Sequence, residues 1–122
     1  MSYDVSLLDP VTRERLHAPG EVKHLIAGGT YCLGGTVEMW LNITFNYAPM
    51  FQKAFQNDDG IHVLTGKLGA EAIPLLQSAI SRLGNDVVPD YWEATEGNAK
   101  KALYGLLALC QMRPDGVIDI SY

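Results

Sequence analysis

The sequence predicts a single α+β domain over residues 1–122, with three or four helices packed on a small antiparallel sheet. Three observations support this fold class. Both ends of the chain carry segments that alternate apolar and polar residues, as strands do. Two segments in the second half have helical spacing with clear start and stop signals. The 122 residues, 48% of them hydrophobic, suffice for one core without disulfides or a structural metal.

The first half of the chain supplies the predicted hairpin of the sheet. Residues 3–8 alternate and end at an Asp-Pro turn, which indicates a first strand. Residues 22–26 are expected to return as a second strand, with residues 11–16 forming the excursion between them. Residues 27–36 repeat a Gly-Gly-Thr element, which is typical of a tight connection and less often of an anion cradle.

Helices are predicted for the rest of the chain. Apolar residues recur at helical spacing over residues 37–55, with Thr36 as the N-cap and a kink or break at Pro49. Residues 70–83 form an amphipathic helix that stops at a Gly-Asn pair. A last helix begins after Thr95 as its N-cap and ends at an Arg-Pro-Asp-Gly sequence. The tail, residues 117–120, alternates and is expected to add an edge strand.

Polar residues on the predicted central helix form the first candidate site. Glu38, Asn42 and Asn46 are spaced at i, i+4 and i+8, so they would share one stripe of that helix. With Trp40 and Tyr47 beside them, they would offer the acceptors, donors and stacking surface that hold a ribose or a base. The alternative is that this stripe is simply the solvent side of the helix.

A second cluster precedes the last helix. Tyr91, Trp92 and Asn98 combine aromatic and polar groups near the free amides of a helix N-terminus, so we include them in the ligand-binding hypothesis. Nearby acids argue against phosphate, and Trp92 is more simply interpreted as a loop anchor on the core.

The acidic residues of this region form a separate candidate surface for a basic protein partner. They lie in one stretch without lysine or arginine, namely Asp86, Asp90, Glu93 and Glu96. A solvated acidic loop is the simpler interpretation.

No motif in the sequence predicts catalysis, a metal or a cofactor. The three histidines and two cysteines lack metal-ligand or redox spacing. A hydrolase would have to pair Glu38 with Glu93 or Glu96, which nothing in their spacing requires. The net charge of −5 and the scattered lysines and arginines argue against direct binding of nucleic acid. With no signal peptide or apolar span in the sequence, we expect a cytoplasmic protein that does not enter membranes.

Several segments together resemble a group of small uncharacterised proteins of bacteria and their prophages. They are Gly28-Gly-Thr-Tyr, Gly34-Gly-Thr, residues 40–49, residues 91–99 and Arg113-Pro-Asp-Gly. The resemblance covers most of the chain and implies, for a phage-borne gene, a counter-defence factor.

The function we expect is a non-enzymatic binding protein, assembled into a homo-oligomer, that sequesters a small nucleotide-like ligand. The alternatives are a protein inhibitor or adaptor that uses residues 86–96 against a host protein and, less favoured, a small hydrolase that uses paired carboxylates.

Overall fold

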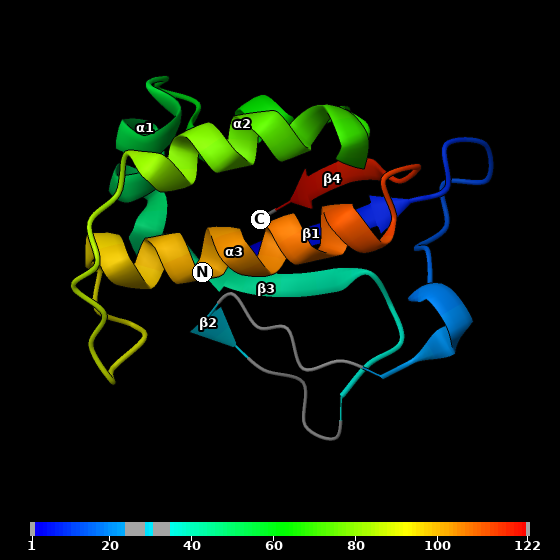
Figure 1. The fold of residues 1–122 in the computed structure, drawn as a ribbon, viewed down its shortest axis with the longest axis horizontal. Coiled ribbons are helices and arrows are strands. Elements are labelled where there is room, and N and C mark those ends of the chain that lie inside the picture. Colours follow the sequence, from blue (N-terminus) through cyan, green and yellow to red (C-terminus); the bar gives the residue numbers. More distant parts are fainter. Residues whose placement is uncertain (1, 24–28, 31–34, 122) are drawn as a thin grey trace.

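The computed structural model describes residues 2–23, 29–30 and 35–121. Its strands and helices are β1 (Ser2–Leu8), β2 (Gly29–Thr30), β3 (Trp40–Thr44), α1 (Ala48–Phe55), α2 (Gly69–Ser81), α3 (Glu96–Met112) and β4 (Val117–Ser121). The strands form one antiparallel sheet in the order β2-β3-β1-β4, and α2 and α3 lie side by side in front of it (Figure 1). This arrangement confirms the predicted α+β class.

The central strand of the sheet is β1, which pairs with β3 on one side and with β4 on the other. Its inward residues alternate with outward ones, so that Val5 lies opposite both Leu41 and Ile120 in the core. The strands predicted at residues 3–8 and 117–120 are confirmed, and β4 is the edge strand that we expected.

The two long helices cover the inner face of the sheet. α2 and α3 confirm the helices predicted for residues 70–83 and after Thr95. The Thr95 hydroxyl accepts a hydrogen bond from the amide of Asn98, which is the expected N-cap. The start of α2 packs tightly against the turn after α3, because a Cβ on Gly69 would lie only 2.9 Å from the carbonyl oxygen of Arg113.

The helix predicted for residues 37–55 is wrong over its first half. Residues 40–44 form β3 instead, with Leu41 and Ile43 buried and Trp40 and Asn42 turned outward. Pairing with β1 decides the outcome, since it places Leu41 and Ile43 beside the apolar residues of β1. The period of two in this segment was therefore the relevant one.

The helix begins only at Ala48, after a short 3₁₀ helix at Phe45–Tyr47. Pro49 lies in the first turn of α1, where its missing N–H costs no hydrogen bond, so it begins a helix rather than ending one. The N-cap predicted at Thr36 is also wrong. Its hydroxyl accepts a hydrogen bond from the amide of Glu38, two residues on, in the approach to β3.

Two predictions lie largely outside the described residues. Of the strand predicted for residues 22–26, only Val22 and Lys23 are described, and neither is in a strand. Of the glycine-rich segment 27–36, Gly29 and Thr30 form β2 and pair with β3. Among the described residues, no helix combines the length and apolar character needed to cross a membrane.

Candidate functional site

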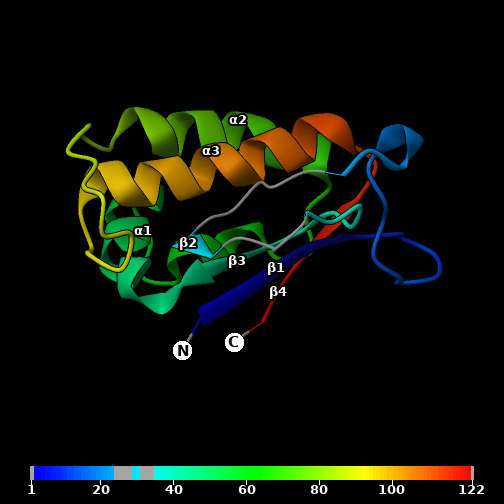
Figure 2. The same cartoon turned by 90° about the horizontal axis from the view of Figure 1, so that it is seen from below.

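The outer face of the sheet is polar, and most of its described side chains are partly or fully exposed. Figure 2 shows α2 and α3 on one side of the sheet and no described helix on the other. Strand pairing puts Asn42, Asp4 and Ser121 in one row across this face, and Trp40, Ser6 and Asp119 in the next. We call this surface, together with Arg15 and Glu38 at its margin, the open face.

Asp4 is the hub of the open face. One of its carboxylate oxygens accepts hydrogen bonds from the indole Nε1 of Trp40, at 3.2 Å, and from Nδ2 of Asn42, at 3.1 Å. The same Asn42 nitrogen donates to the hydroxyl of Ser2 at 2.8 Å. Trp40 and Asn42 are therefore held in fixed orientations by a residue on the neighbouring strand.

Arg15 reaches over the open face from the loop that follows β1. An isolated bridge to Leu8 positions its backbone. Its Nε donates to the hydroxyl of Ser6 at 3.0 Å, and a terminal nitrogen pairs with the carboxylate of Glu38 at 3.1 Å. The guanidinium carbon lies 5.7 Å from the ring centre of Trp40, which is within cation–π range. Arg15 therefore ties Glu38 and Trp40 into one cluster and covers the buried Ser6.

The charge of the open face is negative. It carries three carboxylates, those of Asp4, Glu38 and Asp119, against the single guanidinium of Arg15. The guanidinium is already paired with Glu38. The potential of this surface therefore favours a cationic partner over an anionic one.

The remaining residues of the predicted ligand site hold the loop before α3. Asn98 is only 4% exposed, and its amide oxygen accepts from the amide of Val88. Its amide nitrogen donates to the carbonyl oxygens of Asp90 and Glu93 at 3.1 Å. All of these partners are backbone groups, so this arrangement folds the loop.

Two residues that follow β3 in the sequence, Asn46 and Tyr47, fix the tip of the loop before α3. Asn46 Nδ2 donates to the carbonyl oxygen of Trp92 at 2.8 Å, and the hydroxyl of Tyr47 donates to the carbonyl oxygen of Tyr91. Burial raises the pKa of Tyr47 to about 12, so it stays a donor at neutral pH. The rings of Tyr91 and Trp92 contact each other at a tilt of 31°, with their centres 4.7 Å apart. Trp92 is nevertheless 52% exposed, so it is not the core anchor that we expected.

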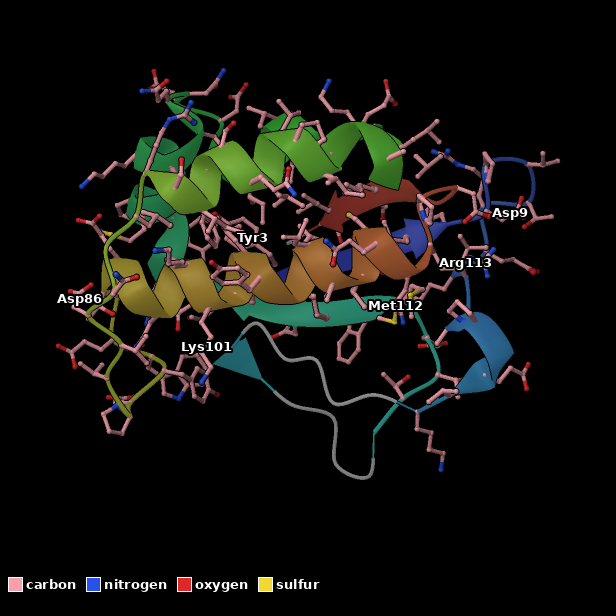
Figure 3. The ribbon with its side chains drawn as sticks, in the orientation of Figure 1. Tyr3, Asp9, Asp86, Lys101, Met112 and Arg113 are labelled. Carbon is pink, nitrogen blue, oxygen red and sulfur yellow. The ribbon has the colours of Figure 1, made fainter. Side chains whose placement is uncertain are left out.

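The predicted acidic surface is largely used within the fold. Asp86, beside the start of α3 (Figure 3), accepts from the amide of Gly97. Asp90 accepts from the amide of Trp92. Glu96 accepts hydrogen bonds from Lys53 and from the amide of Gly84, and these hydrogen bonds lower the pKa of its carboxyl group. Glu93 is exposed and has no side-chain partner among the described residues.

The structure does not present Glu38 and Glu96 as a catalytic pair. Glu38 is engaged by Arg15, and Glu96 by Lys53 and the loop before α3. Cys110 is buried in α3, and burial raises the pKa of its thiol to about 12, so it remains protonated. Within the described ranges, no three histidine, cysteine or acidic side chains gather as metal ligands.

Sequence reasoning missed Asp4, Ser6, Arg15 and Asp119. The signal for three of them was available, because they are the polar, outward positions of the strands at residues 3–8 and 117–120. Arg15 had no such signal, since its place depends on how the loop after β1 folds back.

No protein-family model, curated protein or solved structure matches this chain.

Proposed function

We propose that this chain is a non-catalytic binding protein and that its open face docks on a basic surface of another protein. The observation that carries the proposal is the fixed cluster of Asp4, Trp40 and Arg15 on a sheet face that no described helix covers. A sheet face is broad rather than enclosed, whereas small molecules are usually held in clefts or cavities.

Residue type and rigidity both support docking. Tryptophan and arginine are the side chains most enriched where binding energy is concentrated. Trp40 is held from the side by Asp4 and covered on its ring by Arg15, so little side-chain freedom remains to be lost on association. An interface of this kind needs no rearrangement of the sheet.

Charge defines the partner. The carboxylate of Asp119 is exposed on the open face, and only one oxygen of Asp4 accepts hydrogen bonds from the described residues. Lysine or arginine side chains of a partner can pair with both groups. The nucleotide-like ligand expected from the sequence stays a prediction, and this face is unfavourable for its phosphates.

The same charge argues against self-association through the open face. In a symmetric dimer each carboxylate-rich surface would meet its own copy, and like charges would oppose one another. A homo-oligomer therefore stays a prediction that would use another surface. A catalytic role has less support, because the strongest pKa shifts belong to Tyr47 and Cys110, which are buried away from this face.

A pair of charge reversals tests the proposal. Asp119→Lys changes the open face, whereas Glu93→Lys makes the same change in net charge within residues 86–96. Both side chains are exposed, so both variants are expected to fold. Immobilised wild type and variants are incubated with a bacterial lysate, and retained proteins are compared by quantitative mass spectrometry and then tested singly by calorimetry.

The proposal predicts a basic protein that binds the wild type and Glu93→Lys alike and binds Asp119→Lys at least about tenfold more weakly. Its affinity should also fall as salt is raised, because exposed charges are screened. If only the Glu93→Lys variant loses binding, the interface is instead assigned to residues 86–96. Equal binding by all three proteins would overturn the role of the open face.

A further inference from the structure

A pocket separate from the open face lies where the start of β1 meets α1 and the segment that follows α1. Its volume is about 240 Å³. It is lined by Tyr3, Phe45, Ala48, Gln52, Asp58, Asp59, Gly60 and His62. This lining combines an aromatic wall with an acidic rim.

Three rings form the aromatic wall. Tyr3, labelled in Figure 3, is only 4% exposed, and its ring centre lies 5.1 Å from that of Phe45. The ring of His62 meets Tyr3 edge to face at 5.5 Å. Tyr3 also contacts the fully buried Phe51 from the core side, so the wall rests on a rigid base.

Two neighbouring carboxylates, those of Asp58 and Asp59, form the acidic rim. The backbone that carries them is fixed, because Gln52 donates to the carbonyl oxygen of Asp58 and Asn57 accepts from the amide of Asp59. Among the described residues, neither carboxylate takes part in an ion pair or a side-chain hydrogen bond, and none that lines the pocket is a lysine or arginine. The rim therefore contributes two negative charges, and no lysine or arginine among the described lining residues offsets them.

We propose that this pocket binds a small organic cation with an alkylated ammonium group. Aromatic faces attract such cations through the negative potential of the ring, and carboxylates add the opposite charge. A phosphate or carboxylate ligand would be repelled by Asp58 and Asp59. A bare metal ion would prefer a shell of oxygen ligands, which an aromatic wall does not supply.

The volume of the pocket limits the size of the ligand. Its volume is below the ~300 Å³ at which pockets for drug-sized ligands begin. The pocket therefore suits a compact ammonium head group, either free or at the end of a longer side chain. Because none of its lining residues belongs to the open face, the inference stands independently of the proposed docking function.

Choline and its uncharged isostere 3,3-dimethyl-1-butanol separate charge from shape. Each is titrated into the full ¹⁵N-labelled chain at pH 8, and the amide signals of Gln52 and Gly60 are followed by NMR. Choline is expected to cause saturable shifts at these amides, and the isostere to bind at least about tenfold more weakly, since it lacks the cation–π and ionic attraction. Equal binding of both compounds would overturn the proposal.

Variants locate the effect within the pocket. The double change Asp58→Asn with Asp59→Asn, and separately Phe45→Leu, should each weaken choline binding about tenfold. Asp119→Asn, on the open face, is the matched control and should leave it unchanged. The absence of a saturable shift with choline up to about 100 mM, or full competition by an equal concentration of sodium ions, would refute an organic-cation site.

Discussion

Replacing Asn98 with alanine is expected to destabilise the protein, because this side chain holds the loop before α3. The change removes three hydrogen bonds, from the amide of Val88 and to the carbonyl oxygens of Asp90 and Glu93. It leaves the backbone of α3 intact, since alanine is a good helix former. The hypothesis that Asn98 contacts a ligand predicts no such loss in the free protein.

The magnitude follows from the burial of Asn98. A hydrogen bond in a protein contributes about 1 kcal/mol net, and the loss is larger when the partners stay buried without replacement. Asn98 is 4% exposed, whereas its partners lie on a loop that water can reach in part. We therefore expect a loss of about 2–3 kcal/mol in the free energy of unfolding, or roughly 10 °C in Tm for a domain of this size.

Urea unfolding followed by circular dichroism measures this loss, with Asn46→Ala as the matched control. Asn46 is exposed and makes one described side-chain hydrogen bond to the same loop, so its replacement should cost less than about 1 kcal/mol. A loss below about 0.5 kcal/mol for Asn98→Ala would refute the structural role and return Asn98 to the candidate ligand site.

Two further predictions concern pH and packing. Burial raises the pKa values of Cys110 and Tyr47 to about 12, from 9.0 and 10.0, so the folded protein keeps protons that the unfolded chain loses. The free energy of unfolding should therefore fall as the pH rises from 9 to 12, and it should fall less steeply in Cys110→Ala. A urea midpoint that does not change over this pH range would contradict the prediction. Gly97→Ala should cost more than about 2 kcal/mol, because its Cβ would lie 2.5 Å from the backbone nitrogen of Val87. Gly84→Ala, with its nearest atom at 3.7 Å, should stay within about 0.5 kcal/mol in the same urea assay, and equal losses would refute the close approach.

The outer elements of the fold were predictable because their signals are local. The cap at Thr95 and the apolar stripe of α2 are properties of short segments, and the structure keeps both. The alternation in β1 and β4 likewise needs no knowledge of the partner strand. These elements established the α+β class without any tertiary information.

The centre of the chain was mispredicted because two periods fit it. Val37, Leu41 and Ala48 suit a helix, whereas Leu41 and Ile43 with outward Asn42 suit a strand. The choice depends on β1, which lies about forty residues away and offers Val5 as a partner for Leu41. The propensities of residues 37–55 alone cannot predict a contact with a strand so far away in the sequence.

The candidate site, like the fold, was predicted only in part from the sequence. Asn42 was identified as a site residue from a helical stripe and Trp40 as an aromatic residue beside that stripe. The two share the open face instead because a strand turns alternate residues to one side. Asn46 shared that stripe but lies beyond the end of β3, where it holds the loop. The identities of the polar residues were thus informative even where their assumed geometry was wrong.

Trp40 is the residue that distinguishes a binding surface from a solvated one. A sheet face that only meets water needs polar side chains, and Asp4, Ser6 and Asp119 satisfy that need. The partly exposed indole of Trp40, fixed by a carboxylate and with a guanidinium over its ring, adds apolar surface that solvation does not require. This additional apolar surface favours a docking surface over a face that only meets water. The charge reversal at Asp119 tests this interpretation without changing Trp40 itself.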